Sequence, residues 1–547
     1  MSIKVPDGPS RTAARLYAFA KRCVRIDSRS LAAFRISFGA LIVADALLRA
    51  RNFHYFYTDQ GVVPLSMALS RSGTDNPVTV FALTTNETAI AAIFVLYFLV
   101  GVQLMLGWKT RIATVLAFFL VISFDFRNPF VTSYADIIFR MLLFWGIFLP
   151  LGERWSLDAA HRVREARPHV ENLASFAILA QLLVMYVVNG YHKYGNDKWM
   201  SGEATPLVLG MDEITWLLAP QMRELAPALM IGGLFWVYLL LFAWVLFFLR
   251  GWARAIYAGA LMGGHASFMI TVRIGAFPYA TAGGLLLFIP GRVWDDLAGM
   301  LARAGVDRAT LGAIQDRVAG VGRSVPNPRI DRGWFPEARQ FAYDFVLVVM
   351  VVSLIVTGLG QGLHEAGHID DEEWEHLEGI DEGLAMINMD MPNWSIFAPN
   401  PRTTDRYYVA AGQTESGEQV DVYNDREFTF ERPAHHDLHW EMYDTYRERF
   451  FMNSVRRDGQ RGSDGVDVTF GDHLCEEFNE NHDDELRYIN LYVVQEPVTM
   501  DTLDEPADRE RYAYRLYEHG CGDNEPEQMS PPRLNLTDRD LASASED

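Results

Sequence analysis

The feature that most constrains this chain is a series of apolar runs, each close to the length that crosses a lipid bilayer as a helix. A helix of about 20 apolar residues spans the hydrocarbon core and satisfies its own backbone hydrogen bonds. Nine such runs are separated by polar or turn-forming segments: 31–48, 89–106, 112–124, 135–151, 173–188, 228–249, 255–271, 276–290 and 341–359. We therefore predict an α-helical polytopic membrane protein of about nine spans, with the lipid bilayer as its surroundings.

The positions of arginine and lysine predict how these spans are oriented. Cytoplasmic loops of membrane proteins carry an excess of Arg and Lys. With a cytoplasmic N-terminus, the basic loops at 107–111, 152–172, 250–254 and 291–340 all fall on the cytoplasmic side. We expect a multi-pass protein of the cell membrane, with its C-terminal domain and the segment after the fifth run on the outside.

Charge divides the chain into two unlike parts. Residues 361–547 hold 45 acidic and 15 basic residues, a balance of −30, whereas the rest holds 24 acidic and 33 basic residues. An acidic, lysine-poor surface is typical of halophilic proteins, because high salt screens the repulsion between carboxylates. An ordinary acidic extracytoplasmic domain is the alternative. Nucleic-acid binding is not expected, because no exposed basic stripe accompanies the acidic part.

We expect six segments along the chain. A cytoplasmic N-terminal segment (1–30) precedes the transmembrane core (31–290) and a basic cytoplasmic linker (291–340). The last span (341–360) leads to an extracytoplasmic α+β domain (361–521) and a disordered acidic tail (522–547). In the α+β domain the pattern predicts a hairpin of 406–412 with 419–423, a helix over 442–457 and a buried strand over 486–494.

Two features of the acidic part leave alternatives open. Cys475 and Cys521 form a disulfide if this part faces an oxidising compartment, and otherwise remain two thiols. The stretch H-E-A-G-H (364–368) has the spacing of zinc peptidases, with His364 and His368 as ligands and Glu365 as the base. A third ligand at the spacing of the longer zinc signatures is not evident, so no metal is expected.

Ionisable side chains inside the predicted spans are candidates for function, because a charge in hydrocarbon is costly. They are Arg35, Asp45, Asp136, Arg140 and His265. Asp136 and Arg140 stand at i, i+4 and can pair, in which case they only hold the helices together. His265, Met269 and Arg273 follow one another at i, i+4 and i+8, so they can line a pocket that opens outward. A packing role for His265 is the alternative.

The most unusual segment follows the fifth run and reads N-G-Y-H-K-Y-G-N-D-K-W-M-S-G-E-A (189–204). The chain has five lysines among 48 basic residues, and two of them, Lys193 and Lys198, lie here. Arg stays charged at any workable pH, whereas a desolvated Lys can become a neutral base. Lys193, beside His192 and close to Trp199, is therefore a candidate base. A lysine that anchors the helix end at the membrane surface is the alternative.

Six motifs in a fixed order carry a resemblance to a known family. They are F-Y-T-D-Q-G-V-V-P (56–64), G-W-K-T-R (107–111), R-N-P-F-V-T-S-Y-A-D (127–136), F-L-P-L-G-E-R-W-S-L-D (148–158), H-K-Y-x-x-x-K-W-x-x-G-E-A (192–204) and W-S-I-F-A-P-N-P (394–401). Together they resemble the horizontally transferred transmembrane domain (HTTM) family, whose best-known members are the vitamin K-dependent gamma-carboxylases. The resemblance covers about 30–290, and the last motif extends it beyond the final span.

The resemblance implies a chemistry for Lys193. In the carboxylases of this family a lysine deprotonates a reduced naphthoquinone, of the vitamin K or menaquinol type. The quinol then reacts with O2 to give an epoxide and a strong base, which removes a γ-proton from a peptide glutamate that takes up CO2. Lys193 matches that lysine, with one residue more before Trp199 than expected, and His265 ahead of R-I-G-A-F matches a family histidine. The expected catalytic residues are Lys193 and His265, and the expected cofactor-binding residues are His192, Trp199 and Arg273.

Departures from the family leave a second class of function open. The animal carboxylases have a much larger C-terminal half that binds substrate peptides, whereas the acidic part here is short and would repel a glutamate-rich peptide at low salt. We expect either a gamma-carboxylase-like enzyme that acts on a glutamate of a protein or peptide, or a non-catalytic membrane binding or scaffold protein of the same fold. No feature of the sequence indicates an oligomeric state.

Overall fold

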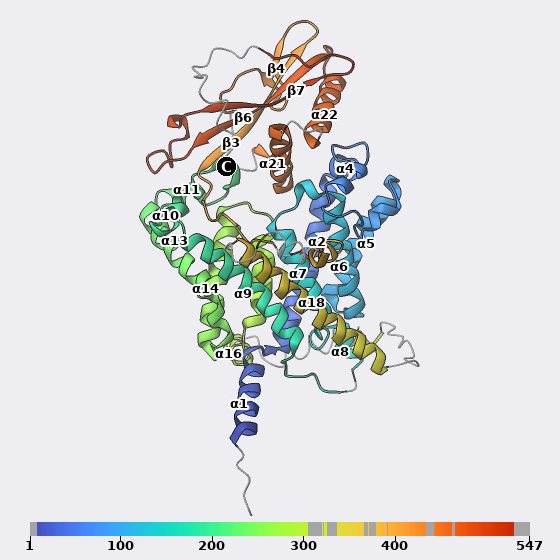
Figure 1. The fold of residues 1–547 in the computed structure, drawn as a ribbon, viewed down its shortest axis with the longest axis vertical. Helices are drawn as coiled ribbons and strands as arrows, with labels where there is room; N and C mark the ends of the chain where they lie inside the picture. The colour runs from blue at the N-terminus through green and yellow to red at the C-terminus, as the bar shows by residue number, and fades with distance from the viewer. Residues whose placement is uncertain are drawn as a thin grey trace, which may run out of the picture.

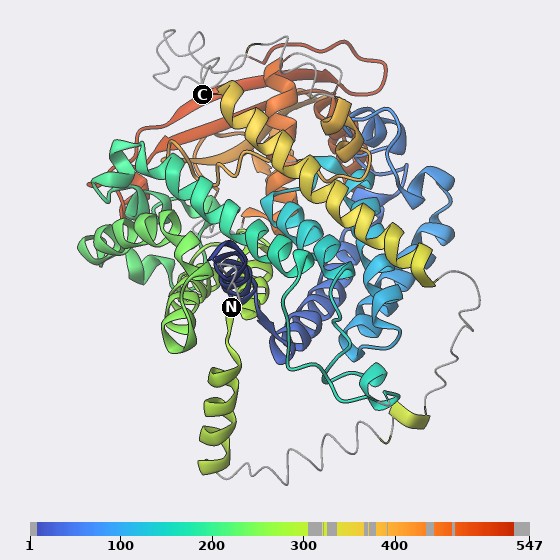
Figure 2. The ribbon, with the colours of Figure 1, turned by 60° about the horizontal axis from the view of Figure 1, so that its bottom comes forward.

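The structure is a computed structural model that describes residues 8–162, 164–304, 320, 322–324, 336–365, 370, 379–390, 392–433, 442–461 and 465–529. It consists of a helical body with a smaller sheet domain at one end (Figures 1 and 2). The helices that cover the nine predicted runs are α2 (Ser28–Arg51), α5 (Glu87–Leu106), α6 (Thr110–Arg127), α7 (Tyr134–Ile147), α9 (Leu173–Tyr194), α13 (Ala226–Leu241), α14 (Gly251–Thr271), α15 (Phe277–Leu285) and α18 (Pro336–Glu365). Each predicted apolar run therefore forms a helix.

Other elements precede, connect or follow these helices. They are α1 (Gly8–Cys23), β1 (Ile26–Asp27), α3 (Phe53–Tyr57), α4 (Leu65–Ser70), α8 (Leu157–Ala160), β2 (His169–Val170), α10 (Asp197–Met200), α11 (Ala204–Leu209), α12 (Ala219–Arg223) and α16 (Gly291–Arg303), with 3-10 turns at Val80–Leu83, Pro129–Val131, Asp212–Ile214, Ala243–Phe247 and Leu286–Phe288. A further 3-10 turn, Pro506–Asp508, lies in the C-terminal domain. β1 and β2 pair antiparallel and join the start of α2 to the segment before α9.

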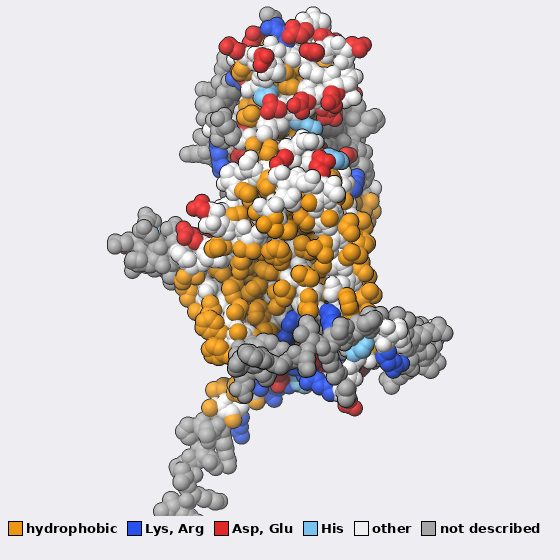
Figure 3. Space-filling view, turned by 90° about the vertical axis from the view of Figure 1, so that its right-hand side faces the viewer, with side chains coloured by type: hydrophobic (Ala, Val, Ile, Leu, Met, Phe, Trp, Pro, Cys, Tyr) orange, Lys and Arg blue, Asp and Glu red, His pale blue; other side chains and the backbone are white. Residues whose placement is uncertain are grey.

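The composition of the helical body fits a bilayer. Four of the described helices are long and apolar enough to cross a membrane, namely Ser28–Arg51, Glu87–Leu106, Leu173–Tyr194 and Gln340–Gly360. On the face shown in Figure 3, an apolar band separates an end rich in Lys and Arg from an end rich in Asp and Glu. Apolar side chains exposed in a continuous band are stable only against hydrocarbon. The prediction of a helical membrane protein is confirmed, whereas nine spans and their orientation remain predictions.

The C-terminal domain contains a five-stranded antiparallel sheet in the order β5-β4-β3-β6-β7. Its strands are β3 (Thr404–Thr414), β4 (Gln419–Asp421), β5 (Arg426–Glu427), β6 (Leu486–Pro497) and β7 (Tyr512–Gly520), and its helices are α21 (Tyr446–Arg461) and α22 (Val466–Asn481). The predicted hairpin is β3 with β4, and the predicted buried strand is β6. The predicted helix is α21, which begins at Tyr446 rather than at 442 and lies between the sheet and the body (Figure 1).

Two motifs of the body form the platform on which this domain rests. Ser454 Oγ of α21 donates a hydrogen bond of 2.9 Å to the carbonyl oxygen of Phe130. Thr469 Oγ1 of α22 donates one of 2.7 Å to the carbonyl oxygen of Val62. Val62 belongs to F-Y-T-D-Q-G-V-V-P and Phe130 to R-N-P-F-V-T-S-Y-A-D. These motifs therefore position the C-terminal domain.

The end of the described chain is tied to the sheet. Cys475 and Cys521 form a disulfide, with 5.6 Å between their Cα atoms, and Cys23 is a buried free thiol. The predicted tail begins at 522; its residues 522–528 are exposed, whereas Met529 is buried and donates its N–H to Asn490 Oδ1. Residues 530–547 lie outside the described residues, as does His368 of H-E-A-G-H. The zinc interpretation of that stretch therefore stays untested.

The ionisable residues of the spans form a network instead of the predicted pair. Among the described ion pairs none joins Asp136 to Arg140. Three carboxylates and three guanidinium groups alternate in what we call the charge network: Asp45, Arg49, Asp125, Asp136, Arg140 and Arg447. Arg447 comes from α21, and its guanidinium lies 2.7 Å from Asp45 and 3.0 Å from Asp136. The predicted pair was wrong because partners distant in sequence compete for both side chains.

The surroundings of Arg35 and of two glycines show how they are used in the helical body. Arg35 donates to the backbone carbonyls of Leu151 and Arg154, so it holds the loop of the F-L-P-L-G-E-R-W-S-L-D motif. Gly259 and Gly263 stand at the small-xxx-small spacing that favours close helix packing, but a Cβ atom at either position would meet no atom within 4 Å. Both glycines lie on an exposed face of α14, so no described helix packs against them.

Candidate functional site

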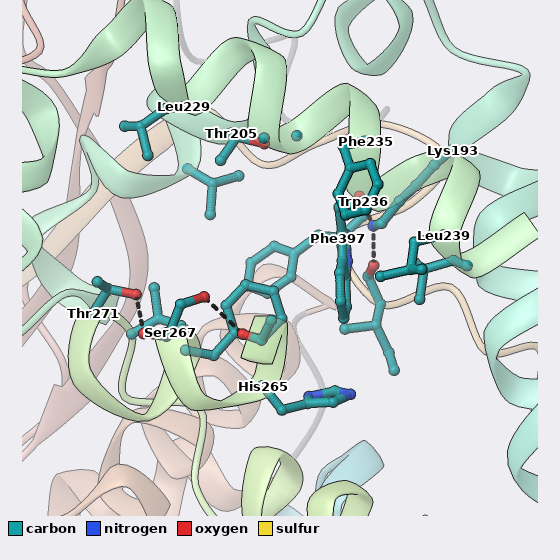
Figure 4. A pocket seen from close by; sticks show the side chains of 18 of the residues that line it. Lys193, Thr205, Leu229, Phe235, Trp236, Leu239, His265, Ser267, Thr271 and Phe397 are labelled. Carbon is teal, nitrogen blue, oxygen red and sulfur yellow. Dashed lines mark hydrogen bonds between the residues drawn. The ribbon is translucent and has the colours of Figure 1, made fainter. Parts of the chain in front are cut away.

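A cavity of about 400 Å³ lies inside the body, beside the segment predicted to hold the base (Figure 4). Its walls come from α9, α11, α13 and α14 and from residues 396–397, which precede the sheet domain. Most lining side chains are apolar or aromatic, and Lys193 and His265 both line it. A volume in this range and an apolar wall with few polar groups are typical of sites for small organic ligands.

One face of α9 supplies the polar side of this cavity. Asn172 and Ser175 form a capping box at the start of the helix, which fixes where its turns begin. Tyr186, Asn189 and Lys193 then follow at i, i+3 and i+7, so they lie on the same face. All three side chains are buried. The periodicity of the helix therefore turns all three toward the cavity.

Lys193 is held by backbone carbonyls. Its Nζ lies 2.6 Å from the carbonyl oxygen of Ile396 and 3.1 Å from that of Phe397, and 3.9 Å from the ring centre of Trp199. The residue is 3% exposed, and no described carboxylate forms an ion pair with it. The side chain points from α9 toward the cavity, and Figure 4 draws the hydrogen bond to a carbonyl oxygen of this segment.

The turn after α9 brings Trp199 back under Lys193. The helix ends at Tyr194 with Gly195 as its C-cap, and the side chain of Asn196 then accepts hydrogen bonds from the N–H groups of Lys198 and Trp199, which caps α10. Gly202 follows with φ +87°, and a Cβ there would lie 2.7 Å from the carbonyl oxygen of Met230. The K-W-x-x-G part of the motif is thus needed to fold this turn against α13.

The segment 394–397, the W-S-I-F part of the last motif, presents its carbonyls to α9; we call it the carbonyl segment. Trp394 and Phe397 have φ values of +50° and +51°, which are uncommon for residues with a side chain. Asn189 Nδ2 donates to the carbonyl oxygens of Trp394 and Ile396, both at 2.9 Å. Local backbone strain of this kind persists only where surrounding contacts determine it. Asn189 and Lys193 provide those contacts here.

His265 faces the same cavity from α14. Its Nε2 lies 2.9 Å from the hydroxyl oxygen of Tyr186, and its ring packs edge-on against the Trp236 ring. The residue is 1% exposed, and its Nδ1 is buried without a hydrogen-bond partner among the described residues. A buried polar atom without a partner costs free energy unless a ligand or a water satisfies it. His265 can therefore hydrogen-bond a ligand in the cavity.

The structure brings three of the five predicted site residues together. Lys193, Trp199 and His265 line one cavity, whereas His192 and Arg273 are not among its lining residues. His192 Nε2 lies 3.2 Å from the carbonyl oxygen of Asn393, at the start of the turn that leads into the carbonyl segment. The Arg273 guanidinium donates to the carbonyl oxygens of residues 443 and 444 in the C-terminal domain. Met269, the middle member of the predicted stripe, also lies outside the lining.

Four residues of this site are not among the predicted ones: Tyr186, Asn189, Trp236 and Phe397. Tyr186 and Asn189 could have been found, because they precede Lys193 by two helical turns and one. Trp236 and Phe397 could not, because they reach the cavity from helices and segments whose placement no local pattern predicts. The W-S-I-F motif belongs to the family resemblance, but it does not indicate that the backbone carbonyls of this segment bind Lys193.

Aromatic rings and a few hydrogen-bonding atoms make the cavity suitable for a flat ring with polar substituents. Trp236, Phe268 and Phe397 line its walls. Lys193 Nζ and His265 Nδ1 are polar atoms that can reach such a ring. A reduced naphthoquinone, with two hydroxyl groups on a planar ring, fits this set of groups. Among the described residues no cluster of three metal-binding side chains occurs.

Comparison with known proteins supports one family. No curated protein and no solved structure matches the chain. The model of the HTTM domain matches residues 24–292, a range that contains eight of the nine predicted apolar runs and both Lys193 and His265. The resemblance predicted from the order of the motifs is therefore confirmed, and residues 24–292 form an HTTM domain of the kind found in membrane proteins related to the vitamin K-dependent carboxylases.

Proposed function

We propose that this protein is a quinol-dependent enzyme of the gamma-carboxylase type, in which Lys193 is the base. The observation that carries the proposal is the buried lysine on an apolar cavity, bound to two carbonyl oxygens and unpaired with any described carboxylate. A buried ammonium without a counter-charge is costly, so these surroundings favour the neutral amine that a base requires. The alternative role, a lysine that anchors the helix end at the membrane surface, does not require the side chain to be buried.

The hydrogen bonds of Lys193 also suit a neutral amine. An uncharged amine has two N–H bonds and one lone pair. The carbonyl oxygens of Ile396 and Phe397 can accept both N–H bonds, which leaves the lone pair for a proton from a ligand in the cavity. The carbonyl segment therefore orients the base, and the ring of Trp199 lies against its Nζ.

His265 is proposed to hold the ring in place. Its unpartnered Nδ1 can bond to a ring oxygen, while the bond between Nε2 and Tyr186 keeps the imidazole from turning. A bound quinol would react with O2 to give its epoxide and water, and the base formed on the way would permit carboxylation of a glutamate by CO2. What this chain supplies is proton removal at Lys193, a dry aromatic wall and a fixed imidazole.

The membrane setting is part of the proposal. With a cytoplasmic N-terminus the cavity lies in the outer half of the bilayer, below the acidic domain. Proteins or peptides with a glutamate are the proposed carboxylation substrates, and high salt is expected to favour their approach because screening weakens repulsion from the acidic domain. His192 and Arg273 would then support the site indirectly, through the backbone contacts that tie it to the C-terminal domain.

Naphthoquinol epoxidation by the purified protein tests the proposal. We expect Lys193→Ala to lower the rate about 100-fold or more, the usual contribution of a general base. Lys193→Met keeps the length of the side chain and should lose the same activity, which separates chemistry from packing. The matched control is Lys198→Ala, which removes the neighbouring exposed lysine and should leave the rate unchanged.

The outcomes discriminate between the classes of function. Epoxidation that survives in both Lys193 variants would contradict the role of the base. No epoxidation in the wild type, at low or high salt, would favour the non-catalytic binding or scaffold protein, for which the two carbonyl contacts of Lys193 are structural. Zinc that co-purifies with the protein and is lost with His364→Ala would instead support the peptidase interpretation of 364–368.

A further inference from the structure

A second cavity, of about 740 Å³, lies at the junction of the C-terminal domain and the HTTM domain; we call it the polar cavity. Its walls come from α22, from the turn between β4 and β5 and from the start of α21, and Asn52 and Tyr55 of the HTTM domain complete it. It shares no lining residue with the cavity beside Lys193. Its volume is in the range of sites for small ligands.

One face of α22 forms a wall of the polar cavity. The lining residues of this helix recur at helical spacing, which places them on the same face: Phe470, His473, Leu474, Glu477, Phe478 and Asn481. Cys475 of the same helix is joined by the disulfide to Cys521, which directly follows β7. The wall is therefore held by a helix that is tied to the sheet.

The polar cavity is lined by four carboxylates, whereas none of its described lining residues is a lysine or an arginine. The four are Asp425, Asp444, Glu448 and Glu477, and none of them forms an ion pair with a described lysine or arginine. Asp425 and Glu477 each lie 3.7 Å from a histidine, which is a counter-charge only when it is protonated. Carboxylates that share a cavity repel one another, so a cation between them is favourable.

Glu448 is held in place and still has room for a ligand. Its carboxylate accepts hydrogen bonds from the N–H of Asp444 at 2.9 Å and from the hydroxyl of Tyr423 at 3.4 Å. An ionised carboxylate has about four acceptor positions, so some of them are left for a donor in the cavity. A charged N–H donor forms the strongest hydrogen bonds with such a group.

Aromatic rings supply much of the remaining surface of the polar cavity. They belong to Tyr55, Tyr423, Phe470 and Phe478. The ring of Tyr423 packs edge-on against that of Phe470, with 6.0 Å between their centres. The face of an aromatic ring attracts organic cations, so rings beside carboxylates suit ammonium and guanidinium groups. A metal ion is not indicated, because no cluster of three metal-binding side chains occurs among the described residues.

The polar cavity opens to water rather than to hydrocarbon. Five of its lining residues are exposed, and all five are polar: Asp425, Asp444, Glu477, Asn481 and His482. Figure 3 shows Asp, Glu and His side chains gathered on the C-terminal domain, beyond the apolar band of the helical body. A ligand of this cavity therefore comes from the aqueous phase.

We propose that the polar cavity binds a small organic cation with at least two ammonium or guanidinium groups, as polyamines have. One group of the ligand donates to the remaining acceptor positions of Glu448, and another pairs with Asp425 or Glu477 at the mouth. The chain between these groups packs on the aromatic rings. The site contains neither Lys193 nor His265, so it goes beyond the quinol chemistry and does not depend on it.

Binding of spermidine to the full-length protein tests the proposal. Isothermal titration calorimetry is performed in nanodiscs of zwitterionic lipid, which does not compete for the amine, at the lowest salt at which the protein stays folded. Triacetylspermidine keeps the chain of spermidine without its charges. Tetralysine carries the same ammonium groups on a peptide, so it distinguishes a free amine from lysine side chains as the source of this chemistry.

Two variants and one matched control locate the site. Glu448→Gln removes the charge of the partly buried carboxylate and keeps an accepting oxygen, and Glu477→Gln removes a charge at the exposed mouth. The control is Glu476→Gln, which removes the same charge from an exposed position of α22 that does not line the cavity. The unfolding temperature of each variant shows whether it is folded. If Glu448→Gln fails to fold, the comparison of Glu477→Gln with Glu476→Gln still decides.

We expect Glu448→Gln to weaken spermidine binding about tenfold or more, because a charge-assisted hydrogen bond is lost. Glu477→Gln should weaken it about threefold, and Glu476→Gln should leave the affinity within about twofold of the wild type. Equal weakening in Glu476→Gln and Glu477→Gln would overturn the site, because the overall charge of the domain would then attract the amine. Triacetylspermidine that binds as tightly as spermidine would overturn the cationic class of the ligand.

Two further comparisons identify the ligand more closely. Spermidine that binds more tightly than tetralysine supports a free amine, whereas binding of tetralysine alone would overturn the small ligand in favour of a basic peptide. Mg²⁺ binds carboxylates but gains nothing from aromatic rings. Displacement of spermidine by an equal concentration of Mg²⁺ would therefore contradict the role given to the rings.

Discussion

Two regions of the helical body bury ionisable side chains, one with partners of opposite charge and the other without any among the described residues. In the charge network, three carboxylates meet three guanidinium groups, and Arg49 alone contacts Asp45, Asp125 and Asp136. At the cavity, Lys193 is just as buried but contacts only carbonyl oxygens and an aromatic ring. Every member of the first region has at least one partner of opposite charge. Lys193 has no described partner of opposite charge that would hold its amine in the charged form.

This contrast separates structural from functional ionisable groups inside a membrane protein. A balanced network contributes specificity and joins parts of the chain, since Arg447 inserts from the C-terminal domain between α2 and α7. Lys193 also joins distant parts of the chain, since it binds the carbonyl segment, but it does so without a described partner of opposite charge. A buried ionisable group in such surroundings is a candidate for function.

The largest effect on stability is expected at Arg447, where the network can be broken by one change. Arg447→Met leaves Asp45 and Asp136 without one of their cations, and removing one member of a buried pair costs about 3–5 kcal/mol. In a protein of this size we expect the unfolding temperature to fall by roughly 10 °C. Thermal unfolding of the detergent-solubilised protein measures this.

The control for Arg447 lies on the same helix. Arg461 at the end of α21 is exposed, and Arg461→Met should change the unfolding temperature by no more than a degree or two. Adding Asp45→Asn to Arg447→Met should recover part of the loss, because the pair is then removed together. Additive losses in the double variant would contradict a direct ion pair.

A smaller effect is expected at Asn189, whose side-chain amide supports the carbonyl segment that binds Lys193. Asn189→Leu removes both hydrogen bonds to the carbonyl segment, each at 2.9 Å, and keeps the volume of the side chain. We expect about a tenfold lower epoxidation rate and an altered pH dependence of kcat, because the carbonyls that orient Lys193 lose their support. Tyr191→Phe, at an exposed position of the same helix, is the control. An unchanged pH profile in Asn189→Leu would show that the segment is only a packing element.

Features that depend on residues close together in the sequence could be predicted from it. Apolar periodicity, turn residues and capping are local, so the nine helical runs, the hairpin of β3 and β4 and the strand β6 were all predictable. The position of Lys193 was also predictable, from the rarity of lysine and the order of the motifs. A local pattern suggested a pair between Asp136 and Arg140, which the structure contradicts.

What escaped prediction depends on contacts between distant segments. Arg447 and Asp45 are 402 residues apart, and Lys193 and Ile396 are 203 residues apart. No helical or strand period indicates that two such residues meet. The cavity is built in this way from α9, α14 and the carbonyl segment, so the sequence could name its candidates but not which of them share a wall.

The last test concerns Glu448, a carboxylate that resembles Lys193 in lacking a partner of opposite charge among the described ion pairs. It accepts hydrogen bonds from the N–H of Asp444 at 2.9 Å and from the hydroxyl of Tyr423 at 3.4 Å. Burial raises the pKa of its carboxyl group from 4.5 to about 7. The folded state therefore binds a proton that the unfolded state has released between these two values, so stability should fall as the pH rises from about 4.5 to about 7 and then level off.

Glu448→Gln keeps the accepting oxygen and removes the charge, so it should abolish this pH dependence. We expect the variant to be about 1–3 kcal/mol more stable than the wild type at pH 8 and equal to it near pH 4.5. Unfolding measured across that pH range compares the two, with the exposed Glu480→Gln of α22 as a control that should follow the wild type. A gain at pH 8 that persists undiminished at pH 4.5 would mean that the amide improves packing. Such a result would mean that burial of the Glu448 carboxylate without a cation does not lower stability. Lys193 in the helical body would then have no counterpart in the C-terminal domain.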